Sequence, residues 1–369
     1  MHMEKAHPDK KTVSLSQIAK VIMIVALILM TLFGAFFDNI CYLLRPVTDD
    51  RKAIVGYYAE KDDTLDMVYV GASTVYRFWS PMYAWKKSGL TSYSFAAPGM
   101  PAPMNKPMVD EALKSQSPKL IIVDLYSYVA RNNNKEYLPI HIERVSSSLN
   151  YSEGRNELID NTAKYDMPYL TDNQIRDFKQ DIRMYINRIR DLDFKSLSYA
   201  TNHVTDDYKG FRFFASKEAL QTPDLEILDI KEKIEISDST KVMLDDIMDY
   251  SDKNDVEICF IMSPLQITET RKKILNSIEE YVNARDFEFI DMCEKYEEIG
   301  IDFKTDYYNG SHVNILGAEK YTDYLLSYLN TKYDFTDHRG EDGYENWEKS
   351  YLKYSKKAKQ TKSIINSLK

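Results

Sequence analysis

The chain has 369 residues, 44% of them hydrophobic, and a formal net charge of -9. This length suits two average domains or one large α/β domain with an insertion, and the acidic balance without a dominant basic stripe argues against nucleic acid as a partner. Three cysteines give neither a disulfide framework nor paired metal-ligand spacing, and the sequence contains no GxGxxG, P-loop or HExxH motif. We therefore expect no cofactor and no metal.

The first expected element is an apolar segment at residues 18–37, IAKVIMIVALILMTLFGAFF, with one charge, Lys20. Its length matches the thickness of a bilayer core. A cleaved signal peptide is the alternative, but the run is longer than a usual apolar h-region and no small-residue cleavage site follows it. The lysines before the segment favour a retained signal-anchor, with a cytoplasmic tail at 1–17 and all that follows outside the cell. Residues 38–64 are then expected to be a connecting stalk, partly helical.

After the stalk, short apolar stretches with the character of buried strands alternate with helical patterns. The expected strands lie within 67–73, 91–99, 119–129, 257–264 and 288–292. The expected helices lie near 103–116, 267–285 and 315–329. This alternation predicts βαβ crossovers and a mostly parallel sheet flanked by helices, in one α/β domain over residues 65–335.

Two segments do not follow the alternation. Residues 130–240 contain a charged helical pattern at 171–192 and lead back to the sheet through a helix at 239–253, so we expect a largely helical insertion or cap. Residues 336–369 form a basic tail with apolar residues at roughly helical spacing. A solvated, partly frayed terminal helix is the simpler interpretation of this tail, and a contact with anionic lipid or a wall polyanion is the alternative.

Two residues stand where chemistry is expected. Ser73 follows the first strand directly, between small residues and the next helix, in VYVGASTVYRF. His312 lies in the loop DYYNGSHVN before the helix at 315–329. In an open α/β sheet both loops are expected at the carboxyl ends of the strands, where ligands bind. Ser73 and His312 would then form a nucleophile and base pair, with the Ser73 amide as an oxyanion donor.

GAS with Ser73, APG with Gly99 after the second strand, and an N/D-x-x-H element ending at His312 together resemble the SGNH/GDSL hydrolase superfamily. More narrowly, their order resembles its membrane-anchored envelope branch, which includes the teichoic-acid D-alanine transfer protein and the polysaccharide O-acetylation factors. The resemblance covers about residues 65–130 and 255–330. It implies an SGNH/flavodoxin-like sheet, Ser73 as nucleophile, His312 as general base and Gly99 as an oxyanion amide.

The sequence departs from the family at the asparagine of the third motif. The corresponding strand reads VDLYSYV and ends at Asp124. Asn105 and Asn132 are the available substitutes, and the sequence places neither of them.

A second departure concerns the acid, because Asn309 occupies the aspartate position of the family's D-x-x-H pattern. Asp306 lies three residues earlier in the same loop. Three alternatives remain open: Asp306 orients His312, a Ser73–His312 dyad suffices, or the protein is a weak or inactive relative.

The expected activity is hydrolysis or transfer of acyl esters on a cell-envelope glycan or teichoic-acid-like polymer. In a transferase, the resemblance implies that a multi-spanning membrane O-acyltransferase supplies the acyl group. One rival is a catalytically inactive SGNH-fold scaffold or wall-binding protein that partners such an acyltransferase. The other rival is a plain esterase for small esters.

Overall fold

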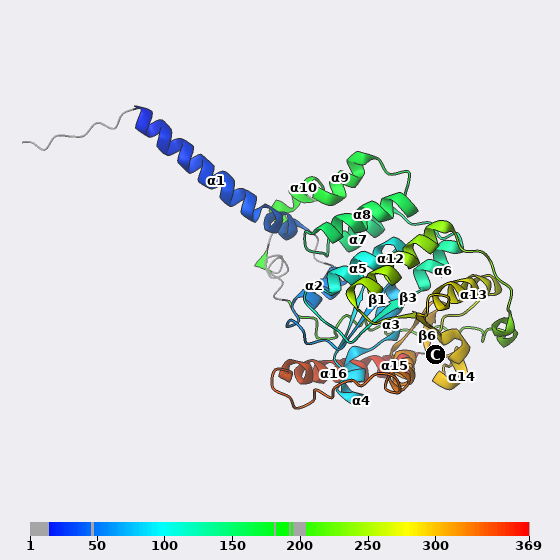
Figure 1. Cartoon of the computed structure of the whole chain (residues 1–369). Helices are drawn as coiled ribbons and strands as arrows, with labels where there is room; N and C mark the ends of the chain where they lie inside the picture. Colours follow the sequence, from blue (N-terminus) through cyan, green and yellow to red (C-terminus); the bar gives the residue numbers. More distant parts are fainter. Residues whose placement is uncertain (1–14, 46–47, 181, 192, 195–203, 369) are drawn as a thin grey trace, which may run out of the picture.

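The computed structural model describes residues 15–45, 48–180, 182–191, 193–194 and 204–368 (Figure 1). Its centre is a five-stranded sheet in the order β2-β1-β3-β4-β5, with every neighbouring pair parallel. The strands are β1 (Met67–Gly71), β2 (Ser92–Ala96), β3 (Leu120–Asp124), β4 (Ile258–Met262) and β5 (Glu288–Asp291). Each lies within one of the five stretches expected from the sequence, so the predicted α/β class with a mostly parallel sheet flanked by helices is confirmed.

The strands form where they do because their side chains are buried on both faces of the sheet. Every residue of β1, β2, β3 and β4 is buried, as expected of a parallel sheet between two helical layers. From β1 the chain moves outward to β2 and then returns to β3 on the other side of β1. The direction of winding thus changes between β1 and β3, and their carboxyl ends flank the crevice where such sheets bind ligands.

Helices cover both faces of the sheet. Figure 1 shows α5 (Asn105–Ala112) and α12 (Asp238–Asn254) on one side, with α15 (Ile315–Leu329) and α16 (Glu345–Ser367) on the other. The remaining helices around the sheet are α3 (Ser73–Phe78), α4 (Pro81–Ser88), α6 (Tyr126–Asn132), α13 (Glu269–Asn283), α14 (Tyr296–Ile299), and the short 3-10 turns η1 (Ala102–Met104) and η4 (Met292–Lys295).

Among the described residues of the insertion, helices are concentrated in the first half, which stacks beyond α5 in Figure 1. This half contains α7 (Pro139–Ser146), α8 (Glu153–Asp166), α9 (Asp172–Gln180), α10 (Ile182–Tyr185) and η2 (Ile186–Asp191). The single helix expected at 171–192 is therefore broken, and its residues 181 and 192 lie outside the described residues.

The second half of the insertion differs from the expected helical cap. Residues 206–237, here called the strap, contain one 3-10 turn, η3 (Leu225–Asp229), and are otherwise irregular. The apolar residues of the strap do not recur at helical or strand spacing. Backbone amides of the strap donate hydrogen bonds to carbonyls of other elements. They donate to carbonyls of α3, of strand β6 (Tyr307–Asn309) and of α13, through the pairs Arg212–Tyr76 (3.0 Å), Glu218–Tyr307 (2.9 Å) and Ile234–Lys273 (3.1 Å). The strap therefore crosses the molecule from the β2 edge to the β5 side.

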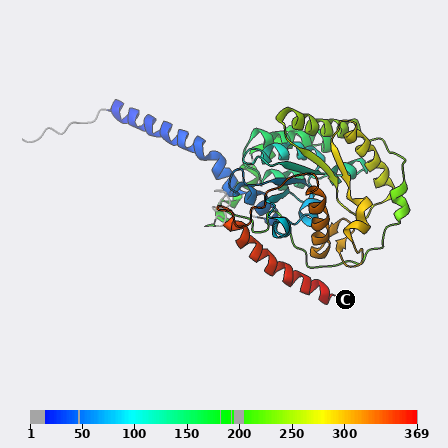
Figure 2. The same ribbon diagram turned by 60° about the horizontal axis from the view of Figure 1, so that its bottom comes forward.

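The helix α1 (Leu15–Leu44) projects away from the body in both views (Figures 1 and 2). Ten apolar side chains between Val21 and Leu32 are 48–65% exposed. Among the residues described in full, no helix is both long and apolar enough to cross a membrane. The predicted span 18–37 and the predicted tail 1–17 lie partly outside those residues.

Part of the segment expected to form a stalk packs on the α/β body. Helix α2 (Asp49–Tyr58) packs on β2, where Tyr57 stacks on Phe95 with ring centroids 4.2 Å apart. The hydroxyl of Tyr93 also donates to the carbonyl of Ala53 at 2.6 Å. The boundary of the domain therefore lies earlier than residue 65.

The terminal helix α16 also differs from the frayed helix expected. Its residues Trp347, Tyr354, Ala358 and Ile365 are 1–5% exposed, and the helix packs on α4 and α15. The strap adds a buried ion pair beside it: Lys209 Nζ lies 2.7 Å from the Glu60 carboxylate and 4.6 Å from the centre of the Trp347 ring. These contacts join α2, the strap and α16.

Candidate active site

Ser73 is the first residue of α3 and is half-buried at the carboxyl end of β1. The turn before it requires a very small residue. A Cβ atom on Gly71 would lie 2.7 Å from Cβ of Asp124, so β1 and β3 approach each other too closely there for any side chain. The chain turns sharply through Ala72 and presents Ser73 at the crevice between the two strands.

His312 reaches Ser73 from a small antiparallel hairpin. Strands β6 (Tyr307–Asn309) and β7 (His312–Val313) form this hairpin, and β7 packs on α3. The Asn314 side chain fixes the transition to α15, because its oxygen accepts the Leu316 amide at 2.9 Å. Nε2 of His312 lies 2.7 Å from Oγ of Ser73, across 239 residues of sequence.

Asn309 determines which nitrogen of His312 carries the proton. Its Oδ1 accepts the backbone amide of Ser311 at 2.9 Å, which fixes the orientation of the side-chain amide. The same oxygen lies 2.9 Å from Nδ1 of His312, so Nδ1 must be the donor of that bond. The lone pair of the neutral ring is then on Nε2 and faces the Ser73 hydroxyl, as a general base requires.

Asp306, the carboxylate expected as an alternative partner for His312, is directed elsewhere. Its carboxylate accepts Lys320 Nζ at 2.7 Å and the Asp302 amide at 2.8 Å. Thr305 Oγ1 donates to it at 3.1 Å, and the residue is 1% exposed. Because both ring nitrogens of His312 are engaged by Ser73 and Asn309, the interpretation in which Asp306 orients the imidazole is corrected: Asp306 fastens the hairpin to α15.

The environment of His312 favours the neutral imidazole. Burial lowers the pKa of His312 to about 4, and the positive charges of Arg77 and Lys135 act in the same direction. At neutral pH the ring is therefore unprotonated and able to accept a proton. The same low pKa makes it a weak base, because the imidazolium formed during reaction is not balanced by a carboxylate.

An aromatic and cationic wall lies behind the imidazole. Tyr308 stacks on His312 with ring centroids 5.5 Å apart, and Phe214 of the strap stacks on Tyr308 at 4.1 Å. The Arg77 guanidinium lies 5.3 Å from the centre of each of the two outer rings. No sequence motif pointed to Phe214, which lies in the aromatic run FRFF of the strap.

Gly99 lies in the loop after β2, beside the turn that carries Ser73. Ala96 pairs with Gly71 across the two strands, and the Ala97 amide donates to the Gly71 carbonyl at 3.4 Å. Gly99 has a left-handed backbone (φ +63°), and a Cβ atom there would lie 2.8 Å from Cδ2 of His141. Glycine is therefore required at this position for two reasons: the left-handed backbone conformation, and the close approach of the His141 imidazole.

The two asparagines considered as replacements for the family's third motif are engaged in other contacts. The side-chain amide of Asn105 donates to the carbonyl of Ala102 at 3.1 Å and to Ser127 Oγ at 3.3 Å. The amide of Asn132 donates to the carbonyl of Tyr128 and to Thr240 Oγ1, both at 2.9 Å. The structure does not bring either donor to Ser73.

Asp124 is a buried carboxylate that fixes the position of the residue next to Ser73. It ends β3, is 0% exposed, and accepts hydrogen bonds from Thr74 Oγ1 (2.7 Å), Ser263 Oγ (2.9 Å) and the Tyr126 amide (3.0 Å). Burial raises the pKa of Asp124 to about 6 despite these donors. Because Thr74 follows Ser73, this carboxylate anchors the first turn of α3. The sequence showed Asp124 only as a departure from the family motif.

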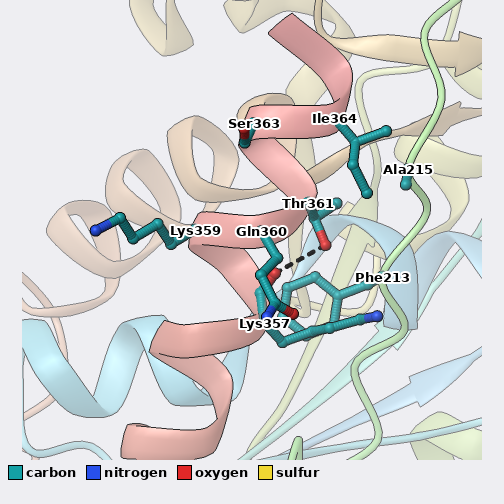
Figure 3. Close-up of a pocket in the computed structure, with 8 residues that line it drawn as sticks. All are labelled: Phe213, Ala215, Lys357, Lys359, Gln360, Thr361, Ser363 and Ile364. Atoms are coloured by element: carbon teal, nitrogen blue, oxygen red, sulfur yellow. Dashed lines mark hydrogen bonds between the residues drawn. The ribbon is translucent and has the colours of Figure 1, made fainter. Parts of the chain in front are cut away.

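Two pockets lie among the elements that surround the sheet. One of about 890 Å³ is lined by Lys135, Tyr137, Tyr165, Tyr169 and Asp166, among others. A second, of about 570 Å³, lies between α16 and the strap, where Figure 3 shows Ile364 directed toward Ala215 and Phe213 below Gln360. Within the described part of the chain, no group of three or more His, Cys, Asp or Glu side chains is placed to hold a metal ion.

Comparison with known proteins does not assign this chain to a family. No protein-family model matches this chain, and no curated protein sequence matches it. Conclusions about its function therefore depend on the geometry of the site.

Proposed function

We propose that this protein is a membrane-anchored, extracytoplasmic serine esterase or acyltransferase of the SGNH type. One observation carries the proposal: Ser73 Oγ lies 2.7 Å from Nε2 of a histidine whose Nδ1 proton is held by Asn309 at 2.9 Å. Nucleophile, base and orienting group stand in the order that acyl transfer requires. Ser73 stands at the carboxyl end of β1, beside the crevice between β1 and β3, which is the usual ligand site of such sheets.

The proposed reaction has two steps. Ser73 Oγ attacks the acyl carbonyl while His312 Nε2 takes its proton, and the amides of Ser73 and Gly99 stabilise the resulting oxyanion. The intermediate collapses when the imidazolium returns this proton to the leaving alcohol, and the acyl group stays on Ser73. His312 then deprotonates water or an acceptor hydroxyl, which attacks the acyl-serine and restores the free enzyme.

The surroundings of the pair support a polymeric envelope substrate. The pocket of about 890 Å³, which Lys135 helps to line, combines tyrosine rings with amide and charged groups, a composition suited to hydroxyl-rich ligands. Arg77 and Lys135 bring positive charge to the imidazole, which would suit an anionic polymer. A cell-envelope glycan or a teichoic-acid-like polymer meets these requirements.

The proposed location follows from the apolar helix α1. Ten large apolar side chains of one helix, exposed by about half or more, would be unfavourable in water and favourable in lipid. An anchor of this kind, with the N-terminus in the cytoplasm, would hold the site close to the outer membrane surface. A multi-spanning membrane O-acyltransferase is then the proposed partner and acyl donor.

A catalytically inactive SGNH-fold scaffold is the alternative function. Asn309 in the acid position and the pKa of about 4 for His312 favour it, because both weaken the base. Such a protein would still partner the acyltransferase or bind the wall.

A fluorophosphonate probe separates the two functions. The full chain, purified in detergent and also left in its membranes, would be labelled as wild type, Ser73→Ala and His312→Ala. Ser327→Ala, which removes an exposed hydroxyl on α15, is the matched control. We expect labelling of wild type and Ser327→Ala alone. Absence of label on the folded wild type, in membranes as well as in detergent, would overturn the esterase proposal in favour of the scaffold.

A further inference from the structure

We propose that His141, from the insertion, is a further catalytic residue whose Nε2–H donates to the oxyanion beside Gly99. The inference rests on the proposed acyl chemistry and adds to it a donor that the sequence did not indicate. His141 is on α7, outside every motif that pointed to the site, and sequence reasoning set it aside for that reason.

The first argument is contact with the oxyanion loop. His141 directs one edge of its imidazole at Gly99: a Cβ atom on that glycine would lie 2.8 Å from Cδ2 and 3.0 Å from Nε2. Because glycine has no side chain, nothing stands between this edge and the Gly99 backbone. The nitrogen that could donate therefore lies against the residue whose amide is assigned to the oxyanion.

The second argument is the shared electrostatic environment of the two histidines. The loops that carry Ser73 and Gly99 leave neighbouring strands at the paired residues Gly71 and Ala96. The positive charge of Lys135 acts on His312 and on His141 alike, while burial is the largest cause of the lowered pKa in each. Both imidazoles therefore lie within the electrostatic reach of the same ammonium group.

The third argument is the tautomer of His141. The Leu138 amide at the start of α7 donates to Nδ1 at 3.0 Å. The Leu138 carbonyl lies at the same distance from Nδ1, but it already accepts the His141 amide at 2.8 Å. The Leu138 amide can only donate, so Nδ1 is the acceptor of that bond and the proton of the neutral ring is on Nε2. Among the described residues, no hydrogen-bond partner of Nε2 is found.

The fourth argument is that the two asparagines considered for the site do not supply a side-chain donor there. The amides of Asn105 and Asn132 donate to the carbonyls of Ala102 and Tyr128. A neutral imidazole N–H has the same capacity to donate one hydrogen bond. Helix α7 of the insertion would thus supply a side-chain hydrogen-bond donor that the loop after the third strand does not supply.

The test measures turnover of p-nitrophenyl acetate by the full chain in detergent. His141→Phe keeps the ring shape and removes the donor, His141→Gln keeps an N–H, and His338→Phe is the matched control in a polar loop. We expect kcat to fall about 10²-fold to 10³-fold for His141→Phe with little change in KM, with partial recovery in His141→Gln. The control should match wild type.

A role limited to capping α7 predicts a different result. His141→Phe would then melt at a lower temperature with kcat unchanged, which would overturn the inference and leave the proposed function standing. An inactive wild type overturns both. If His141→Phe does not fold, the test is made on the wild type by NMR. After phosphonylation of Ser73, the proton on Nε2 of ¹⁵N-labelled His141 should become hydrogen-bonded and protected from exchange with solvent. A signal unchanged by phosphonylation would also refute the inference.

Discussion

Replacing Asn309 by aspartate should strengthen the base of the site. The new carboxylate would keep the 2.9 Å contact with Nδ1 of His312 and the bond from the Ser311 amide, so the geometry stays the same and only the charge changes. For charges about 4 Å apart at an effective dielectric constant of about 20, the attraction is about 4 kcal/mol. This corresponds to a rise of about 3 in the pKa of His312 before desolvation of the aspartate is subtracted.

We therefore expect the pKa of His312 to rise from about 4 to about 6 in Asn309→Asp. A stronger base should speed phosphonylation of Ser73 at pH 7, on the order of 10-fold. The assay is the second-order rate of labelling by a fluorophosphonate between pH 3.5 and 8. The midpoint of the rising limb should move from about pH 4 to about pH 6, and the His312 ring resonances should titrate with it.

Asn309→Leu is the matched variant, because it has similar size and no acceptor. It should label more slowly than wild type and show no upward shift of the midpoint. A wild-type midpoint near pH 6.5, or an unmoved midpoint in Asn309→Asp, would refute the charge environment described for His312.

Three further predictions concern the support of the site. Lys209→Met leaves the buried Glu60 carboxylate unpaired and should destabilise the fold by about 3–5 kcal/mol in denaturant titrations, whereas the double variant with Glu60→Gln should recover most of the loss. The raised pKa of Asp124, about 6, means that the folded state holds a proton that the unfolded state has lost. The contribution of this group to the free energy of unfolding is thus lost as pH rises from about 4 to about 6. Over that window the stability of Asp124→Asn should rise by up to about 3 kcal/mol relative to wild type, measured as the free energy of unfolding at each pH. Plots of this free energy against pH that run parallel for the two proteins would contradict the prediction. Gly99→Ala should abolish labelling, while Gly300→Ala, at a left-handed residue with open space around it, should cost only about 1 kcal/mol of stability and leave labelling intact.

The sheet could be read from the sequence because its strands are short apolar runs buried on both faces, which leave a continuous hydrophobic pattern. The terminal stretches could not be assigned in the same way. Helix α2 and the terminal helix each have a buried face, but their partners are Phe95 and Trp85 of distant segments. Amphipathic patterns show that a face will be buried and do not identify the surface that buries it.

The strap shows another limit. Its residues have no repeating pattern because each contacts a different element, and irregular backbone of this kind follows tertiary hydrogen bonds that a sequence does not reveal. Phe214 therefore gave no sign that it would stack on Tyr308.

Within the site, Ser73 and His312 could be paired from the order of the motifs. The group that orients His312 could not be predicted, because Asn309 and Asp306 lie in the same loop. Only the geometry of the hairpin directs Asn309 to the imidazole and Asp306 to Lys320. His141 and Asp124 carried no motif at all, and their positions depend on the packing of α7 and on the carboxyl end of β3.

The separation of the nucleophile and its base, 239 residues along the chain, has a consequence for how the protein is made. Synthesis proceeds from the N-terminus, so Ser73 leaves the ribosome long before the hairpin that carries His312. Until that hairpin folds, the serine is an ordinary alcohol with no base beside it. If Ser73 and His312 act as proposed, the chain would not react with acyl esters during its synthesis, and reactivity would begin only when the last βα unit closes onto the sheet.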